Sequence, residues 1–277
     1  MFNRKFIISV YKLVSTFYVF LFGRKKTQFL NDFLFNLTLD AKGFKNYGDF
    51  KKTGEKNFIK LIKKEVNLSL DIGANIGDYT RLILNETNSN VISFEPLPEA
   101  FKELKKIEFS YPKRLKVFNF AIGECCENQK LYYSNQKSEK ASLIKDLKKL
   151  SFVKDQNINS ILVEKKNLDV FDDFFNGQKI DFIKIDTEGF EYEVLKGAQK
   201  TLKFNNPKFI QIEFNWHQLI KNQSLFRISQ LVDGYDTFRI LPKGDKLLHI
   251  DPSRPENNIY HLSNYVFIRK DISNKYK

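Results

Sequence analysis

The feature that most constrains the fold of this chain is an alternation of short apolar segments with helix-like segments after Asn67. Strands that alternate with helices predict a parallel sheet with helices on both faces, which is an α/β fold. The last part of the chain is rich in β-like segments that we expect to pair as antiparallel strands. The expected strands span residues 68–72, 90–94, 115–121, 181–185, 209–214, 237–241, 246–250 and 265–268, and the expected helices span 79–85, 98–108 and 191–202.

The strongest local motif is a glycine-containing loop at the end of the first expected strand, which reads Ser69-Leu-Asp-Ile-Gly-Ala-Asn-Ile-Gly-Asp-Tyr-Thr80. Glycines allow a tight turn, and we expect Gly73 and Gly77 where a ligand approaches the main chain too closely for a Cβ atom. The spacing is not the G-x-G-x-x-G of dinucleotide folds, and no Gly-Lys-Ser/Thr of a P-loop is present. The motif therefore disfavours NAD and ATP.

A second motif ends the next expected strand, where Glu95 and Pro96 follow an apolar segment. An acidic side chain at the end of the second strand of such sheets accepts hydrogen bonds from both ribose hydroxyls. The bound group is then an adenosine without a ribose phosphate. A solvated glutamate at a strand end is the alternative, but the two motifs together predict S-adenosylmethionine.

With these motifs the chain resembles the FkbM-type methyltransferases over residues 67–215. The resemblance rests on Asp71-Ile-Gly-Ala-Asn-Ile-Gly-Asp-Tyr-Thr80, Phe94-Glu95-Pro96, Asn119-Phe-Ala-Ile-Gly123, Leu168-Asp169, Ile183-Lys-Ile-Asp-Thr-Glu-Gly-Phe-Glu191 and Val194-Leu-Lys-Gly-Ala198. It implies a Rossmann-like, seven-stranded, mostly parallel methyltransferase sheet with an N-terminal helical extension. Thr187 is a mild departure, since the family usually has a hydrophobic residue there.

The resemblance also implies a cofactor site. Glu95 would hold the ribose hydroxyls, Asp186 would face the sulfonium, and Ala121 with Ile122 would flank the adenine, although these two residues are equally explained as strand core. The residues expected around the methionine end and the ribose are Asp71, Gly73, Asn75 and Gly77, and the same motifs add Ala74, Tyr79, Thr80 and Pro96 to the cofactor-binding set.

Methyl transfer to a hydroxyl requires alignment of the reactants and a base. The candidates for catalysis are Asp186, Glu188, Glu213 and His217, which lie beyond the fourth and fifth strands. His217 follows Glu213 by four residues, so a helix that begins there would place both side chains on one side. Alternatively, His217 is a surface or structural histidine, and Glu188 caps a helix that starts at Gly189.

The net charge is +13, from 46 basic and 33 acidic residues, and a basic excess can indicate nucleic-acid binding. The excess lies at the ends, because residues 1–66 carry 14 basic and 5 acidic side chains and residues 267–277 carry 4 and 1. The remaining residues are nearly neutral. The Asn-Pro-Pro-Tyr-type motif of amino-methylating DNA enzymes is also absent after the fourth strand, where the chain reads Ile185-Asp-Thr-Glu188. We therefore expect no nucleic-acid partner.

Residues 6–22 are mostly apolar and carry a narrow polar stripe of Ser9, Lys12 and Thr16 that continues from Lys5. A basic cluster at 24–26 stands where a signal peptide would have a cleavage site, which disfavours export. The pattern is typical of a helix that lies on an anionic membrane surface, here the inner face, and the alternative is a helix that packs on the catalytic domain or on a partner. We expect a cytoplasmic protein with three segments, namely this helix at 1–26, a helical cap at 27–66 and a cofactor-binding domain at 67–277.

The two cysteines, Cys125 and Cys126, are adjacent, which indicates a reduced compartment, and no zinc-ligand spacing is present, so we expect no metal. We expect residues 134–160 to form an insertion over the carboxyl edge of the sheet, or else a surface loop. The sequence thus predicts an S-adenosylmethionine-dependent O-methyltransferase that acts on a hydroxyl of a glycan, a small molecule or a lipid-linked acceptor. The alternatives are a nucleic-acid methyltransferase and a catalytically inert, cofactor-binding membrane adaptor.

Overall fold

The computed structural model describes residues 4–133, 141–144, 159–175, 177–243 and 247–277. The chain forms two compact units, Met1–Lys42 and Gly43–Lys277. The first unit consists of the helices α1 (Arg4–Phe22), η1 (Lys25–Thr27) and α2 (Gln28–Ala41). Residues 43–66, which we expected in a cap with residues 27–42, belong to the unit that contains the sheet.

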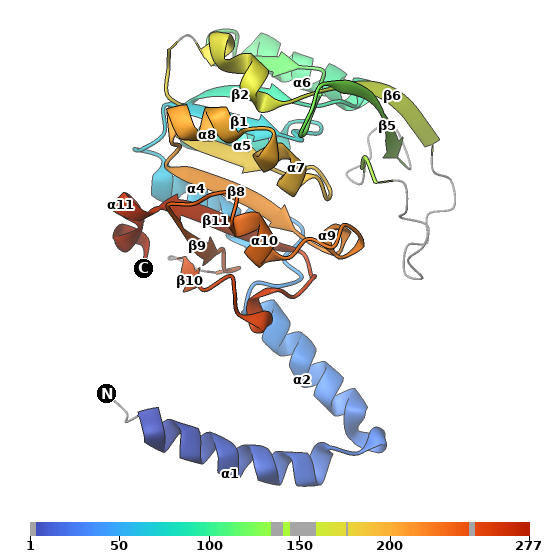
Figure 1. Cartoon of the computed structure of the whole chain (residues 1–277), viewed down its shortest axis with the longest axis vertical. Helices are drawn as coiled ribbons and strands as arrows, with labels where there is room; N and C mark the ends of the chain where they lie inside the picture. The colour runs from blue at the N-terminus through green and yellow to red at the C-terminus, as the bar shows by residue number, and fades with distance from the viewer. Residues whose placement is uncertain (1–3, 134–140, 145–158, 176, 244–246) are drawn as a thin grey trace. The chain divides into compact units, whose positions relative to one another are not determined.

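The second unit is built on an eight-stranded sheet (Figure 1). Five neighbouring strands in the order β8-β7-β1-β2-β3 are parallel, and β11, β9 and β10 continue the sheet beyond β8 as antiparallel strands. Their bounds are β1 (Leu68–Ile72), β2 (Asn90–Phe94), β3 (Leu115–Phe118), β7 (Phe182–Ile185), β8 (Phe209–Phe214), β9 (Tyr235–Arg239), β10 (Leu248–Ile250) and β11 (Ser263–Arg269).

A smaller, three-stranded sheet lies beyond β3 along the chain and has the order β4-β6-β5. Its strands are β4 (Ala121–Ile122), β5 (Glu127–Tyr133) and β6 (Asn159–Lys166). Ser142 forms an isolated bridge with Tyr132 of β5. Most of the expected insertion at 134–160 lies outside the described residues.

Side chains alternate between the two faces along each strand, and both faces of the large sheet carry buried apolar side chains. Helices therefore cover both faces. One face packs against the helices α4, α5 and α6, and the other packs against η3, α7 and α10. The bounds of the helices in this unit are α3 (Phe50–Thr53), α4 (Glu55–Ile62), α5 (Asp78–Glu86), α6 (Pro98–Ser110), η3 (Leu168–Phe175), α7 (Glu191–Lys196), α8 (Gln199–Asn205), α9 (His217–Ile220), α10 (Leu225–Ser229), η4 (Pro255–Asn257), α11 (Lys270–Ser273) and η5 (Asn274–Tyr276).

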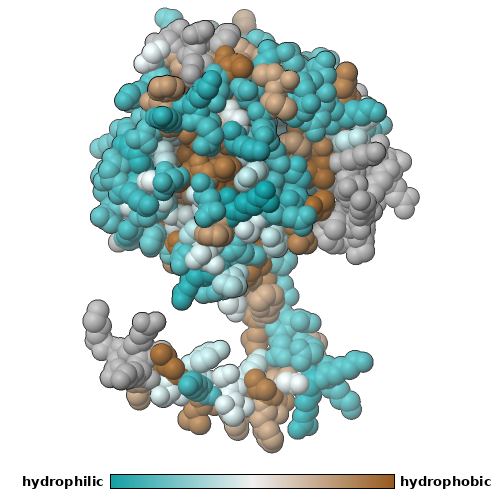
Figure 2. Space-filling view, in the orientation of Figure 1, coloured by the Kyte–Doolittle hydropathy of each residue, from teal (hydrophilic) through white to brown (hydrophobic). Residues whose placement is uncertain are grey.

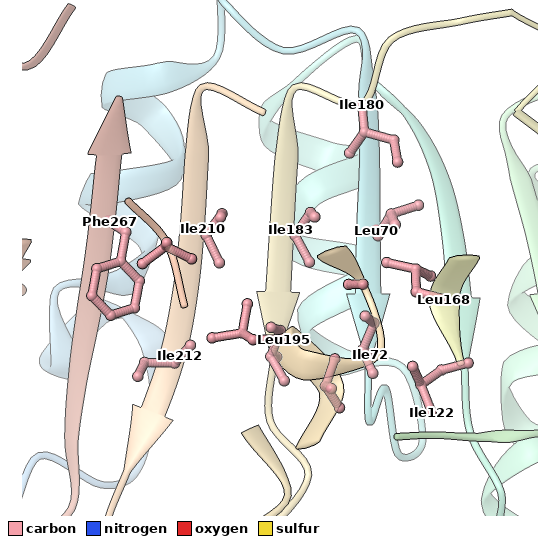
Figure 3. Close-up of a cluster of buried hydrophobic side chains, with 14 of the residues drawn as sticks. Leu70, Ile72, Ile122, Leu168, Ile180, Ile183, Leu195, Ile210, Ile212 and Phe267 are labelled. Atoms are coloured by element: carbon pink, nitrogen blue, oxygen red, sulfur yellow. The ribbon is translucent and has the colours of Figure 1, made fainter. Parts of the chain in front are cut away.

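The apolar core on the second face runs across the middle strands of the sheet (Figure 3). Leu70, Ile183 and Ile210 lie on three neighbouring strands and are at most 1% exposed. Leu195 of α7 and Leu168 of η3 close this core from the helical layer (Figure 3). Burial of this continuous apolar surface is the main force that holds the parallel strands together.

The expected α/β class and the mostly parallel sheet are confirmed. The sheet has eight strands instead of seven, because the short β10 pairs with β9 at the edge. The expected strand at 115–121 is divided between the two sheets as β3 and β4, and the expected helix at 191–202 is interrupted at Gly197. None of the helices in the described part of the chain has the length and apolar character that a membrane crossing requires.

Candidate functional site

A cavity of about 1520 Å³ opens at the carboxyl ends of β1, β2, β7 and β8. Ligands of open α/β sheets bind at this edge, where the strand order reverses between β1 and β7. The start of β11 lies at the same edge, because Ser263 pairs with Phe214 at the end of β8. Residues 46–56 also line the cavity and are tied to this edge by a hydrogen bond from the Asn46 amide to the Leu262 carbonyl.

Gly73 directly follows β1 and has a φ of +82°. A Cβ atom at this position would lie 1.8 Å from the carbonyl oxygen of Asp186, which directly follows β7. The main chains of the two strand ends meet here, since the Asp186 amide also donates to the Ile72 carbonyl at 2.9 Å. The neighbouring main chain is therefore sufficient to require a glycine here, and the expected close approach of a ligand to this position stays a prediction.

Gly77 has a φ of +90° and packs under α6, where a Cβ atom would meet the side-chain ends of Ile107 at 2.3 Å and Leu104 at 2.8 Å. Here too the structural reason is packing within the protein. Gly77 is followed directly by α5, which begins at Asp78. The motif therefore shapes the loop from within.

Asp71 and Thr80 are buried beneath this loop and do not line the cavity. The Thr80 hydroxyl donates to the Asp71 carboxylate at 2.6 Å and is 2.8 Å from the Ser93 hydroxyl. Burial raises the pKa of Asp71 to about 6, although the hydrogen bond from Thr80 opposes this effect. These two residues stabilise the loop from below, and Tyr79, which lines the cavity, donates to Gln211 of β8 at 2.5 Å.

Glu95 links the loop after β1 to the end of β2. Its Oε2 atom accepts a hydrogen bond from the Asn75 amide at 2.8 Å, and its Oε1 atom accepts one from the Leu97 amide at 2.8 Å. Burial raises the pKa of this carboxyl to about 7, and the two backbone hydrogen bonds oppose the rise. Each carboxylate oxygen retains a second lone pair for a hydroxyl donor on the cavity side.

The residues around this carboxyl fit an adenosine-containing cofactor. Asn75 has a left-handed backbone with a φ of 49°, and its buried Oδ1 atom has no hydrogen-bond partner among the described residues. Buried polar atoms are normally paired, so this oxygen indicates a polar group that binds here. Ala74, Asn75, Pro96, Ala121 and Ile122 line the same cavity. We infer that this end of the cavity can hold S-adenosylmethionine.

Three carboxyl groups, those of Asp186, Glu188 and Glu213, lie together where β7 and β8 end, and one oxygen from each lies within 4.8 Å of the others. The buried Lys184 of β7 compensates part of this charge, because its Nζ atom lies 2.9 Å from Asp186 Oδ2. Burial lowers the pKa of Lys184, but the carboxylates of Asp186 and nearby Glu55 outweigh this effect and raise it overall. Oxygen atoms at this spacing can also hold a hard divalent cation, which our sequence prediction of no metal did not include.

Burial raises the pKa of Glu213 well above its ordinary value, and the charges of Asp186 and Glu188 raise it further. Three carboxylates this close together repel one another, and one lysine does not neutralise all three charges. We therefore assign to Glu213 the first proton that this cluster takes up as the pH falls.

His217 is 2% exposed and lies against Glu188 rather than Glu213. Its Nδ1 atom is 3.1 Å from Glu188 Oε2 and 2.7 Å from Asn215 Oδ1. The expected helix that would join Glu213 to His217 is absent, because Glu213 is still in β8 and α9 begins only at His217. Asn215, which the sequence reasoning missed, instead joins both carboxyls, since its Nδ2 atom donates to Glu213 at 2.8 Å and to Glu188 at 3.2 Å.

Glu188 does not cap a helix at Gly189, because α7 begins at Glu191. The Glu191 carboxylate instead accepts hydrogen bonds from the amides of Thr187 and Gly189, which lie in the turn before α7. Glu188 has a left-handed backbone with a φ of 53°, which is unusual for a residue with a side chain and is frequent at functional sites.

Other cavity residues were also missed by the sequence reasoning. Trp216 follows β8, and its ring stacks on His217 with 3.7 Å between centroids. Tyr260 lies before β11 and stacks on Phe214 at 5.3 Å. The sequence did contain a signal for Lys184, because a lysine inside an otherwise apolar strand is rarely buried unless it is paired with an acidic group. Nothing in the local sequence around Tyr260 indicated that its segment returns to this edge.

Comparison with solved structures finds distant neighbours. The chain has 12% identity with an O-methyltransferase from Bacillus cereus in complex with SAH, with a TM-score of 0.42 and coverage of 95% of this chain and 100% of that chain. It has 11% identity with TYW2 of P. horikoshii in complex with MeSAdo, with a TM-score of 0.39 and coverage of 81% and 65%.

Comparison with curated proteins finds the hexuronic acid methyltransferase AglP of Haloferax volcanii, which is 26% identical over 166 residues. The match covers 57% of this chain and 62% of that protein, so the chain spans less than two thirds of that relative. The 2-O-methyltransferase NoeI of Sinorhizobium fredii is 25% identical over 198 residues, with coverage of 68% and 80%.

The methyltransferase FkbM domain matches residues 71–236, which is more than half of the chain. The matched range begins at Asp71 of the glycine loop and includes Glu95, Asp186, Glu188 and His217. The match confirms the predicted S-adenosylmethionine-dependent methyltransferase domain, and the chain belongs to the FkbM methyltransferase family.

Proposed function

We propose that this protein transfers a methyl group from S-adenosylmethionine to a hydroxyl oxygen of a glycan or another small or lipid-linked acceptor. The observation that carries the proposal is the pair formed by Glu188 and the buried His217, which lies in the same cavity as Glu95 and the loop after β1. A hydroxyl nucleophile requires a base beside the donor, and this cavity combines both sites.

The cofactor, when bound, supplies a methyl group that is activated by the positive charge on sulfur. Glu95 would accept hydrogen bonds from the ribose hydroxyls, and Ala121 with Ile122 would flank the adenine. Asp186 would face the positive end of the cofactor, and its carboxylate is held in place by Lys184. The other expected residues of the cofactor set, Asp71, Gly77 and Thr80, act by positioning the loop.

We assign the base to Glu188 and a positioning role to His217. Nδ1 of His217 faces two acceptors, the carboxylate of Glu188 and the Oδ1 atom of Asn215, so Nδ1 carries the proton. His217 therefore donates to Glu188 and fixes the orientation of its carboxylate. The side chain of Glu188 is 19% exposed and that of His217 is 2% exposed, so Glu188 is the one that an acceptor can reach.

Glu213 has a complementary role in this proposal. Its raised pKa favours the protonated carboxyl, which can donate a hydrogen bond to the acceptor. A neutral Glu213 also leaves Glu188 as the carboxylate that takes the proton of the hydroxyl.

Two observations support a glycan-type acceptor. Aromatic rings stack on the faces of sugar rings, and Trp216 and Tyr260 line the cavity beside the carboxyl groups. The curated relatives are named as methyltransferases of a hexuronic acid and of a 2-O position. The acidic groups of the cavity disfavour a nucleic acid, since carboxylates repel phosphate. We place the protein in the cytoplasm at the inner face of the membrane, where residues 1–26 bring it to lipid-linked acceptors.

The substitution Glu188→Gln tests the proposed base. It keeps the size of the side chain and one acceptor oxygen, and we expect kcat to fall by about 10²–10⁴-fold, the usual contribution of a general base. The measurement is the release of S-adenosylhomocysteine with a panel of glycosides and lipid-linked sugars. Calorimetry with S-adenosylmethionine should give the wild-type affinity.

The matched control is Glu193→Gln on α7, a carboxylate that pairs with Lys221 at 2.8 Å and does not line the cavity. It should retain turnover. His217→Gln should reduce kcat by a smaller factor and shift the pH profile, as expected of a positioning residue. Wild-type turnover in Glu188→Gln would remove this residue from the mechanism, and failure of the wild type to bind S-adenosylmethionine would overturn the proposed function.

A further inference from the structure

We propose that the unit Met1–Lys42 is a two-helix anchor that lies in the surface of an anionic lipid bilayer. The inference goes beyond the proposed methyl transfer and does not depend on it. It adds α2 to the basic, apolar segment at residues 1–26, and it rests on the surface of this unit alone.

The first helix presents large apolar side chains to its surroundings over most of its length. Leu13 is 74% exposed, Tyr11 70%, Phe20 69% and Phe17 65%. Exposed side chains of this size are expensive in water when they occur together, and a contiguous apolar surface marks an interaction site. Figure 2 shows apolar side chains along α1 and α2 on the face of this unit that is turned toward the viewer.

The second helix continues this surface. Phe29, Phe33 and Leu37 follow one another at intervals of four residues and therefore lie along one side of α2. They are 75%, 57% and 51% exposed, and Leu34 beside them is 40% exposed. On the opposite side, Phe35 lies between Asn31 and Asp32 around the helix axis and is 55% exposed. The exposed apolar side chains of α2 are therefore not confined to one side, but the group that includes Phe29 and Phe33 is continuous along its side of the helix.

Hydrogen bonds at the junction hold the two helices as one unit. The Thr27 hydroxyl donates to the Phe22 carbonyl at 2.6 Å, and the Asn31 side chain donates to the same carbonyl at 3.0 Å. The Tyr18 hydroxyl donates to Asn31 at 2.6 Å. These bonds satisfy the end of α1 and tie the start of α2 to it, so both apolar surfaces are presented together.

Charge identifies the partner. This unit has seven basic residues and two acidic ones, and residues 1–26 have no acidic residue at all. Arg24, Lys25 and Lys26 are exposed at the junction of the helices, beside the apolar side chains. Apolar side chains that insert into the bilayer and basic side chains that contact the anionic headgroups both stabilise the binding of a helix to the membrane surface.

The test uses the full chain and sedimentation with vesicles of phosphatidylcholine that contain or lack phosphatidylglycerol. We expect the wild type to bind the anionic vesicles and to bind weakly without phosphatidylglycerol. Phe29→Ser combined with Phe33→Ser should reduce the partition coefficient by about 100-fold, because two large apolar side chains no longer insert. Lys25→Gln combined with Lys26→Gln should reduce it by about 30-fold, since each basic residue near an anionic surface contributes a factor of about five.

Matched controls carry the same substitutions on the other unit. Phe109 is 88% exposed and Phe204 is 69% exposed, so Phe109→Ser combined with Phe204→Ser removes two exposed phenylalanines there. Lys63→Gln combined with Lys64→Gln removes two exposed charges. Both controls should bind vesicles as the wild type does.

Several outcomes would overturn the proposal. If the wild type does not bind anionic vesicles and its sedimentation velocity shows concentration-dependent association that Phe29→Ser with Phe33→Ser abolishes, the surface binds a second copy of the chain. If it neither binds vesicles nor associates, the helices are covered by the remainder of the protein. Equal loss of binding in the control variants would show that the effect is not specific to this unit. Binding of S-adenosylmethionine, measured separately, reports on the proposed function.

Discussion

The close approach of two strand ends at Gly73 leads to a quantitative prediction for Gly73→Ala. An alanine at a φ of +82° costs about 1–2 kcal/mol in backbone strain alone. Its Cβ atom would also lie 1.8 Å from the Asp186 carbonyl oxygen, and real Cβ contacts are not shorter than 3.0 Å. The main chains after β1 and β7 must therefore separate.

Separation at this point affects two backbone hydrogen bonds, from Gly73 to Phe94 at 3.0 Å and from Asp186 to Ile72 at 2.9 Å. Each bond contributes about 1 kcal/mol, and overpacking adds about 1–3 kcal/mol. We expect Gly73→Ala to lower the free energy of unfolding by about 4–7 kcal/mol, a large part of the 5–15 kcal/mol typical of a folded protein. The affinity for S-adenosylmethionine should fall with it, because Asp186 is displaced.

Urea unfolding followed by the fluorescence of Trp216, the single tryptophan, measures this free energy for the unit that contains the site. The matched control is Gly234→Ala, which has a φ of +88° and nothing within 4 Å of the added Cβ atom. It carries the backbone strain alone, so we expect a loss of about 1 kcal/mol. Gly77→Ala should lie between the two, because the side-chain ends of Ile107 and Leu104 can move. Equal losses in Gly73→Ala and Gly234→Ala would refute the reasoning.

Three further predictions concern buried polar groups. Burial raises the pKa of Glu95 from 4.5 to about 7, so the folded state holds this proton more tightly than the unfolded state does and stability falls as the pH rises through this window. Glu95→Gln should make the decrease in unfolding free energy between about pH 4.5 and 7 smaller by about 3 kcal/mol, as measured by thermal or urea unfolding. An unchanged pH dependence would contradict the raised pKa of Glu95. Lys184→Met leaves the carboxylates of Asp186, Glu55 and Glu213 without a buried cation and should cost about 3–5 kcal/mol near pH 8. The loss should become smaller as the pH falls, because the pKa values of Glu55 and Glu213 are raised and these two groups then take up protons; a loss that does not depend on pH would argue against the charge pairing. Ser142→Ala removes the hydrogen bond to the Glu188 carbonyl at 2.7 Å and the one from the Ile144 amide at 3.2 Å. It should destabilise the protein by about 1–3 kcal/mol and lower kcat. Wild-type kinetics in this variant would show that the contact does not position Glu188.

The elements that could be predicted from the sequence are those with a local signal. The strand at 68–72 and the strand at 209–214 are short, mainly apolar segments, and they form β1 and β8 with the expected bounds. The loops that follow the strands were also predictable, because Gly73, Glu95 and Asp186 directly follow buried segments and parallel strands end at the same edge. Local sequence therefore determined the α/β class, the family and the edge of the sheet at which the cavity opens.

The partners of the site residues depended on tertiary structure. Glu188 meets His217 and not a helix end, because β7 and β8 are neighbours whose ends bring residues 29 positions apart in sequence into contact. Tyr260 reaches the cavity because β11 inserts between β8 and β9, a pairing that no local pattern encodes. The requirement for a glycine at position 73 comes in part from the main chain of Asp186, which lies 113 residues later in the sequence.

The charge and apolar pattern of the first 42 residues were readable from the sequence, but their organisation was not. The sequence by itself indicated a helix with basic flanks. The structure joins this helix to α2 through the hydrogen bonds at Phe22 and Tyr18 and leaves many large apolar side chains of both helices exposed. Periodicity determines which side of a helix is apolar, because that depends on neighbours in sequence. Only the tertiary structure decides whether that side is covered, since burial depends on contacts between residues distant in the chain.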